Sequence, residues 1–226
     1  MKRLISNKGF TLVELLTVAA VMSILLSVAV PALSSMAMGN QMNRSLIELA
    51  GTLDQARQYA IANNTYVWVA LRPNSSGNQG DELSVALLAS KTGTDPSPWS
   101  NYGSVPNAQI DIVARPRTFE NIRFEEANTY SQSKIPSLAG KSATSLDNTP
   151  ANNKAVFNIK LPGSGSSANF NRVIQFTPTG EARVSSSVID VVEFGLHSTQ
   201  GKAASENNVA VLRVNGLTGQ TAVFRP

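Results

Sequence analysis

Cysteine is absent from this chain of 226 residues, and histidine occurs once, as His197. These absences exclude a disulfide scaffold, a thiol nucleophile and any zinc site built on two imidazoles or thiolates. Charged residues are also scarce, at 15% against roughly 25% in an average globular protein. Serine, threonine, asparagine and glutamine supply 70 residues instead, whereas 42% of the chain is hydrophobic, enough for a core. The composition disfavours most hydrolytic and redox functions and excludes wholesale disorder.

The net charge of +4 is concentrated at the N-terminus. Lys2, Arg3 and Lys8 lie among the first eight residues, where no acid occurs, and the rest of the chain holds 16 basic and 15 acidic residues. A nearly neutral remainder has no electrostatic footprint for DNA or RNA, so nucleic acid is not expected as a partner.

Candidate catalytic and metal-binding residues are few. His197 with Asp190 and one of Ser185, Ser186 or Ser187 could be assembled into a hydrolase triad. No Gly-x-Ser-x-Gly motif is present, however, and a hairpin-loop position is the favoured interpretation of this histidine. Asp81 and Glu82 lack the alternating spacing of a calcium loop, so we expect them to be solvated acids of a turn. The sequence therefore predicts no enzyme, no catalytic residue, no cofactor and no metal.

An apolar run follows the basic N-terminus. Phe10 to Val30 is interrupted only by Glu14 and a few hydroxyl side chains, and Leu15 to Asn43 carries no charge. Its 21 residues would measure about 31 Å as a helix, close to the thickness of a bilayer's hydrocarbon core. The upstream lysines and arginine predict that the N-terminal end stays in the cytoplasm and that the remainder is exported.

Two kinds of export signal are compatible with this run. A conventional signal peptide could be cleaved near Ser35-Met36-Ala37. Glu14 argues against it, because a carboxylate near the centre of a membrane helix costs roughly 2.5–3.5 kcal/mol or more, with no benefit to a signal peptide. An acid at such a position is better explained by a function and a partner.

The residues Lys8-Gly9-Phe10-Thr11-Leu12-Val13-Glu14-Leu15-Leu16 resemble the class III signal of type IV pilins and type II secretion pseudopilins. The resemblance implies that a prepilin peptidase cleaves between Gly9 and Phe10 and that the new N-terminal Phe10 is N-methylated. It also implies assembly with other pilin or pseudopilin subunits. Pro31 falls where many pilins carry a helix-weakening proline.

The chemistry of the motif explains its form. Gly9 has no side chain, so a protease can approach the backbone closely at the membrane surface. After cleavage, the amino group of Phe10 is a cation beside hydrocarbon and Glu14 is an anion nearby. In a filament, Glu14 of one subunit can pair with the amino terminus of the next, which offsets two desolvation costs and fixes the axial register.

A second helical pattern follows the apolar run. Leu46, Leu49, Leu53, Ala56 and Ala60 recur at steps of three and four, which predicts an amphipathic helix that covers a sheet. A dimerising coiled coil is the alternative interpretation of this stripe. Asn63-Asn64 is the expected stop, since asparagine tolerates the left-handed conformation at a helix C-terminus. Pro31 and Gly39 are expected to bend or loosen the helix between its two parts.

Beyond Asn64 the hydrophobic period changes to two and turn residues become frequent. We expect turns at Pro73–Gly80, Pro178–Gly180 and Gly216–Gly219. The fold class is predicted as α+β, with the long N-terminal helix packed on antiparallel sheets. The expected strands are 65–71, 83–89, 110–114, 154–161, 172–177, 182–185, 188–195, 209–215 and 221–224.

A weaker resemblance extends into this region. The junction from Ala56 to Val69 is similar to that of H-class minor pseudopilins and FimT-like minor pilins, as is the element Ile174–Gly180. FimT-like subunits that take up DNA usually end in a basic strand, whereas this chain has Gly219-Gln220-Thr221-Ala222. DNA binding is therefore not expected.

The sequence predicts a non-enzymatic minor pseudopilin or pilin subunit of a type II secretion or type IV pilus filament. It would be a single-pass protein of the inner membrane with a periplasmic C-terminal domain. The alternative is a secreted or membrane-anchored β-rich binding protein with a conventional signal peptide. The expected parts are a leader at 1–9, a transmembrane and filament-core helix at 10–37, an amphipathic helix at 38–64, and a β-rich domain at 65–226 with long loops at 91–107 and 127–153.

Overall fold

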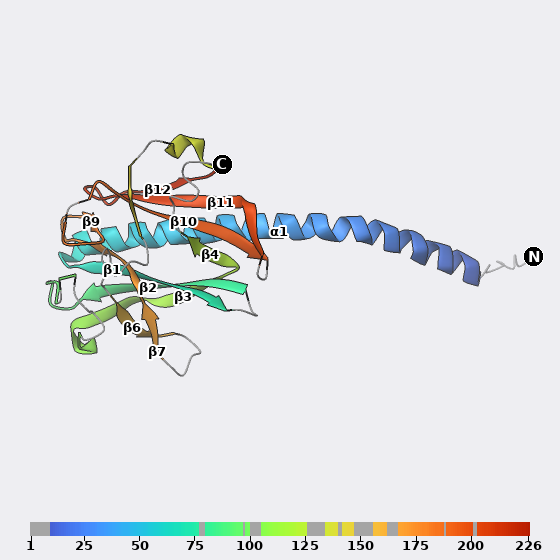
Figure 1. Ribbon diagram of the computed structural model, residues 1–226. Helices are drawn as coiled ribbons and strands as arrows, with labels where there is room; N and C mark the ends of the chain where they lie inside the picture. Colours follow the sequence, from blue (N-terminus) through green and yellow to red (C-terminus); the bar gives the residue numbers. More distant parts are fainter. Residues whose placement is uncertain are drawn as a thin grey trace, which may run out of the picture. The chain divides into compact units, whose positions relative to one another are not determined.

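The computed structural model has an N-terminal helix followed by antiparallel β-sheets, an α+β fold consistent with that of pilins, as predicted (Figure 1). The chain divides into two compact units, residues 1–41 and 42–226, which are described separately below. The structure describes residues 10–76, 80–96, 98–99, 105–125, 134–139, 142–146, 156–161, 167–187, 189–200 and 203–226.

Helix α1 (Leu12–Asn63) contributes to both units. Its helical backbone is unbroken at Pro31 and Gly39, so the loosening expected at these residues does not interrupt the helix. It ends at Asn63 as predicted, because Asn64 takes a left-handed φ of 48° that stops the helical hydrogen-bond pattern.

The second half of α1 packs against sheet residues of its own unit. Its apolar stripe is buried throughout, while Ile47 on the opposite face is 74% exposed. Because the stripe is covered within the chain, it does not form the seam of a dimerising coiled coil. The buried side chains are Met42, Leu46, Leu49, Leu53, Ala56 and Ala60.

Sheet A has the strand order β3-β2-β1-β8-β9 and is antiparallel throughout. Its strands are β1 (Val67–Ser76), β2 (Gly80–Ser90), β3 (Ile110–Glu120), β8 (Arg172–Phe176) and β9 (Ala182–Arg183).

Sheet B has the order β12-β11-β10-β4. The chain enters it directly from sheet A, through Asn121, whose φ of 57° turns β3 into β4. A short strand, β5, joins β10 in parallel. The strands are β4 (Ile122–Glu125), β5 (Thr144–Ser145), β10 (Val191–Gln200), β11 (Ala203–Asn215) and β12 (Thr221–Phe224).

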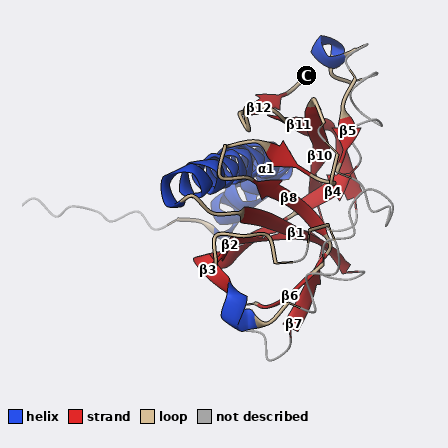
Figure 2. Cartoon of the chain, turned by 90° about the vertical axis from the view of Figure 1, so that its left-hand side faces the viewer, coloured by secondary structure: helices blue, strands red, loops and turns tan. Residues whose placement is uncertain are grey.

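The main core lies where the second half of α1 meets one face of each sheet. Figures 1 and 2 show this part of the helix between the strands of sheet A and those of sheet B. Alternate residues of the strands point inward, as the period of two requires, for example Val67, Val69 and Leu71 of β1 and Val192 and Phe194 of β10. Full burial of each such side chain contributes about 1.5–3 kcal/mol, so this layered core carries most of the domain's stability.

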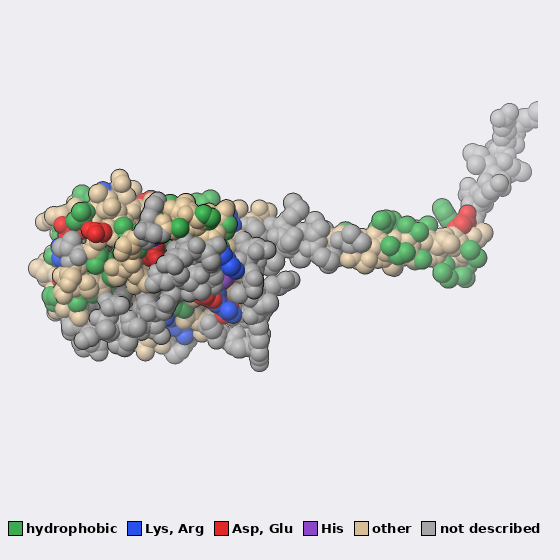
Figure 3. Space-filling model, turned by 45° about the horizontal axis from the view of Figure 1, so that its top comes forward, with side chains coloured by type: hydrophobic (Ala, Val, Ile, Leu, Met, Phe, Trp, Pro, Cys, Tyr) green, Lys and Arg blue, Asp and Glu red, His purple; other side chains and the backbone are tan. Residues whose placement is uncertain are grey.

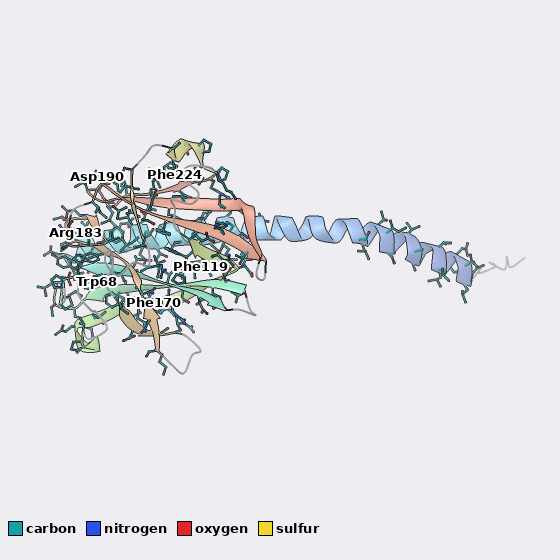
Figure 4. All side chains as sticks on the ribbon, viewed as in Figure 1. Trp68, Phe119, Phe170, Arg183, Asp190 and Phe224 are labelled. Atoms are coloured by element: carbon teal, nitrogen blue, oxygen red, sulfur yellow. The ribbon has the colours of Figure 1, made fainter. Side chains whose placement is uncertain are left out.

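A second core lies on the other face of sheet A. The hairpin formed by β6 (Phe157–Lys160) and β7 (Ser167–Phe170) covers Trp68 of β1, which is fully buried and whose ring lies 5.6 Å from that of Phe157. Figure 4 shows Trp68 and Phe170 on this side of the domain. The central strands β1, β2 and β8 of sheet A are therefore buried on both faces, whereas β3 is largely exposed.

Some predicted boundaries are wrong. The turn expected at Pro73–Gly80 begins too early, since residues 73–76 belong to β1 and Pro73 pairs with Leu83 inside the β1–β2 ladder, while residues 77–79 lie outside the described residues. Proline is tolerated there because β8 pairs with β1 only as far as Leu71, so the other edge of β1 needs no N–H donor at Pro73. Strands β4 and β7 were not predicted, and β10 and β11 are longer than expected.

The two predicted loops have different structures. The described part of 91–107 contains no strand, and a short 3-10 helix, η2 (Asn107–Gln109), begins at its end. The described part of 127–153 contains η3 (Pro136–Leu138) and β5, and its apolar residues Ile135, Leu138 and Leu146 are buried. Ile135 and Leu138 pack on Val211, so this part of the loop covers the outer face of sheet B.

The predicted turns at Pro178–Gly180 and Gly216–Gly219 are confirmed. Gly180 and Gly219 have φ values of 88° and 65°, and a β-carbon on Gly219 would lie 2.3 Å from the carbonyl oxygen of Gly180. The two turns therefore pack against each other, with Arg57 of α1 beside them, and only glycine fits at their contact.

Candidate processing and assembly site

The N-terminus of α1 is closed by a reciprocal pair of hydrogen bonds between Thr11 and Glu14. The amide of Thr11 donates to Oε2 of Glu14 over 2.9 Å, and the amide of Glu14 donates to the hydroxyl of Thr11 over 3.2 Å. The Thr11 hydroxyl also donates to Oε2, over 2.8 Å. This is a capping box, in which two otherwise unsatisfied amides at a helix start find partners.

Thr11 was not predicted to have this role. The pattern Thr-x-x-Glu before an apolar run is the usual signature of a capping box and could have identified it. Oε2 of Glu14 takes both Thr11 bonds, whereas Oε1 has no hydrogen bond or ion pair with any residue in the described part of the chain. One carboxylate oxygen therefore serves the helix start, and the other is available to a group from outside the chain.

The remaining polar side chains of this segment are satisfied within the helix. The hydroxyls of Thr17, Ser23 and Ser27 donate to the carbonyl oxygens of Glu14, Ala19 and Ile24, over 2.7–2.9 Å. Such internal bonds remove the need for water at these groups. Apart from the Glu14 carboxylate, the surface of residues 12–27 is thus compatible with an apolar environment.

The apolar side chains of this segment are exposed. Phe10 is 82% exposed and Leu12 79%, and no residue from 10 to 27 is buried within the chain. Figure 3 shows hydrophobic side chains along this segment, with an acidic one close to its N-terminal end, and Figure 4 shows them projecting on several sides of the helix. No residue in the described part of the chain covers this surface.

In the described residues, no helix combines the length and the apolar character that a membrane crossing requires.

The other candidate residues lie in the folded domain. His197 is on β10 and is 3% exposed, so its predicted position in a hairpin loop is wrong. Its Nε2 lies 3.6 Å from Oε2 of Glu125, on the neighbouring strand β4. Ser185 precedes β10 and donates its hydroxyl hydrogen to the carbonyl of Ser187, whereas His197 is near the far end of that strand. The described structure does not bring the triad candidates together.

Asp81 is also placed differently from its prediction. It lies within β2, is 5% exposed, and accepts a hydrogen bond of 2.7 Å from Nε of Arg123. It is a paired strand residue rather than a solvated turn acid. The described residues contain no group of three or more histidine, aspartate or glutamate side chains arranged to hold a metal ion.

Sheet B also contains a buried ion pair. Glu193 and Arg213 face each other across β10 and β11 and are 1% and 8% exposed. Nε and a terminal nitrogen of Arg213 approach the same Glu193 oxygen, at 2.8 and 2.7 Å. The attraction and hydrogen bonds of such a pair offset at least part of the cost of removing both charges from water.

Comparison with known families identifies one match. Residues 5–30 match the prokaryotic N-terminal methylation motif. The N-terminal segment is type IV pilin-like.

This type IV pilin-like segment includes Gly9, Phe10 and Glu14. The family's motif implies processing by a prepilin peptidase, N-methylation and assembly with other pilin subunits. No curated protein and no solved structure shows significant similarity to the chain. Gly9 lies outside the described residues, and the individual roles of Gly9, Phe10 and Glu14 stay predictions.

Proposed function

We propose that this chain is a non-enzymatic minor subunit of a type II secretion or type IV pilus filament, nearest to the H-class pseudopilins and FimT-like pilins. The observation that carries the proposal is the methylation motif at residues 5–30, which coincides with a helix whose apolar side chains are exposed. A folded β-rich domain does not need such a helix for its own stability, whereas a subunit held in a membrane and then in a filament does.

In this proposal the chain is made as a precursor in the inner membrane, with residues 10–37 spanning the bilayer and the C-terminal domain in the periplasm. A prepilin peptidase cuts between Gly9 and Phe10, and the amino group of Phe10 is methylated. The apolar helix stays attached after the cut, so the mature subunit remains in the bilayer until it is assembled.

The geometry at Glu14 supports its proposed assembly role. The capping box occupies Oε2, and the uncharged run that follows brings no cation near Oε1. The amino terminus of a neighbouring subunit supplies a cation of the right size. A carboxylate that is already held by Thr11 loses less conformational freedom when it pairs, so the capping box preorganises the contact.

The identity of the mature N-terminus tests the proposal. We expect the chain isolated from membranes to begin with N-methylated phenylalanine at position 10, as read by N-terminal sequencing and mass spectrometry. A start at Met38 would instead support a conventional signal peptide and would overturn the proposal.

The variant Gly9→Val sharpens this test. A β-branched side chain at the cleavage junction should block access to the backbone and leave a precursor that is heavier by the nine-residue leader, about 1 kDa. Gel mobility and mass spectrometry of the membrane fraction report the result. A Gly9→Val chain that is cut normally after residue 9 contradicts the assigned cleavage site.

A further inference from the structure

A cleft of about 900 Å³ opens on the face of sheet A that points away from α1. It lies between β3 and the β6–β7 hairpin, and its apolar lining includes Leu88, Phe157 and Ile159, which are 1%, 3% and 5% exposed. The volume lies within the range of roughly 300–1,000 Å³ that is typical of ligand sites. No role assigned above uses this cleft.

The cleft runs along the edges of two strands. Three consecutive residues of β3, Ile110 to Ile112, line it, and so do all four residues of β6. Consecutive side chains of a strand point to opposite faces, so a cavity lined by consecutive residues borders the edge of the strand and not only one face. In the described part of the chain, β3 and β6 are the outermost strands of their sheets. The outer edge of each is therefore not paired with another of the described strands.

The hairpin covers only part of the apolar face beneath it. It packs over Trp68 of β1, but Ile112 at the β3 end is 54% exposed. A sheet of two short strands is marginal by itself, and a third strand beside β6 would both extend it and cover the open β3 end. The shape of the site therefore fits an extended segment.

The charges at the rim define the chemistry of this segment. Asp111 is already engaged by Lys91, whose Nζ lies 3.3 Å from its carboxylate. Along β6, Phe157 and Ile159 point inward and Asn158 and Lys160 outward. Lys160 forms no ion pair with any residue that the structure describes. A residue placed opposite Lys160 on an added strand would be stabilised if it were acidic.

We propose that the cleft accepts an extended segment of a partner protein, which adds as a strand along the edge of β6 opposite to the one paired with β7. Alternate apolar side chains of this segment face Leu88 and Ile112, and an acidic side chain on its outward face pairs with Lys160. Main-chain hydrogen bonds to β6 hold the segment, while the apolar and acidic positions select it. The site is independent of residues 5–30, so its existence does not depend on the proposed filament role.

The test uses the full chain in detergent and a short fluorescent peptide that alternates valine with threonine and carries a central glutamate. Two matched peptides accompany it: one with lysine in place of the glutamate, and one whose backbone amides are methylated so that they cannot donate hydrogen bonds. Fluorescence anisotropy measures binding, and hydrogen exchange measures the protection of the Phe157–Lys160 amides. We expect the glutamate peptide to bind best, the methylated peptide not to bind, and the β6 amides to exchange more slowly when the peptide is bound.

Two charge variants identify the rim contact. Lys160→Glu should weaken binding of the glutamate peptide by about fivefold or more and should make the lysine peptide the better ligand. Arg115→Glu is the control, because Arg115 is an exposed cation on β3, the other strand that borders the cleft, and does not itself line the cleft. Both changes are at exposed positions, and circular dichroism checks that the fold is retained.

Three results would overturn the proposal. The first is that the glutamate peptide does not bind. The second is that the methylated peptide binds equally well, which would indicate an apolar patch rather than a strand acceptor. The third is that Arg115→Glu weakens binding as much as Lys160→Glu does.

Discussion

The two halves of α1 differ in whether their apolar side chains are buried within the chain. Residues 12–27 are apolar on every side, and all of them are exposed, whereas residues 42–60 carry an apolar stripe that is buried. The second half finds its partner in the same chain, in the inner faces of sheets A and B. The first half finds none among the described residues. A helix that is apolar all round is typical of a core or membrane-spanning segment, whereas an amphipathic helix can bury its apolar stripe against its own domain.

The largest expected effect comes from placing a charge on each of the two faces of the second half of α1. Leu49→Asp puts a carboxylate at a position that is 1% exposed, and we expect it to destabilise the domain by about 4–5 kcal/mol, because a buried unpaired charge is among the most damaging changes. Ile47→Asp, two residues away and 74% exposed, is the matched control and should change stability by less than about 0.5 kcal/mol. Thermal unfolding followed by the fluorescence of buried Trp68 measures both. Equal melting temperatures for the two variants would show that the stripe does not face the core.

The next largest effect is expected at Glu14, in the half that depends on partners. Glu14→Leu removes the capping carboxylate and the charge, while Glu14→Gln keeps a side chain that can accept from the Thr11 amide and loses only the charge. If the charge pairs with a neighbour's amino terminus, both variants should lose about 3–5 kcal/mol of assembly free energy, which lowers incorporation by about two to three orders of magnitude. Cleavage after Gly9 should persist in both.

The measurement is the amount of processed subunit in sheared or cross-linked filaments, compared with its amount in the inner membrane. It distinguishes the role of Glu14 in capping α1 from its role in pairing with a neighbouring subunit. If Glu14→Gln is incorporated normally and Glu14→Leu is not, the capping box matters and the pairing does not. Glu14→Asp should be intermediate, since it keeps the charge on a shorter side chain.

The smallest effect is expected from removing the first half altogether. A shortened chain that begins at Met38 retains the buried stripe of α1 and both sheets. Its melting temperature should therefore lie within a few degrees of that of the full chain, and it should be soluble and monomeric with mixed α and β content. Sedimentation and circular dichroism provide the measurements. Aggregation of this fragment, or loss of its sheet signal, would show that the domain needs the apolar half for its own folding.

Local sequence patterns predicted helices and turns correctly where the pattern depends only on neighbouring residues. The stripe from Leu46 to Ala60 predicted the packed helix, and Asn63-Asn64 its end, because a period of 3.6 and a left-handed asparagine depend on nearby residues only. The same holds for the fold class and for the turn at Gly216–Gly219. The motif around Glu14 was likewise evident from consecutive residues, and a family match covers it.

Residue pairings across strands could not be predicted in this way. The sequence placed His197 in a loop and Asp81 in a solvated turn, yet both are buried, beside Glu125 and Arg123 of β4. The ion pair between Glu193 and Arg213 depends on the register of β10 and β11, and a register shifted by one residue would point the two side chains to opposite faces. Such partners are far apart in sequence and become neighbours only when the sheet forms.

The sequence alone determined the apolar N-terminal run, the position of Glu14 within it and the change from helix to strands at Asn64, because each is encoded by adjacent residues. Only the tertiary structure decided that the central strands of sheet A are covered on both faces, that part of the 127–153 segment packs on sheet B, and that β3 and β6 border a common cleft. These features depend on which strand edges and sheet faces remain uncovered after the other strands and faces have packed. That is a property of the whole packed domain, and no single segment of the chain contains it.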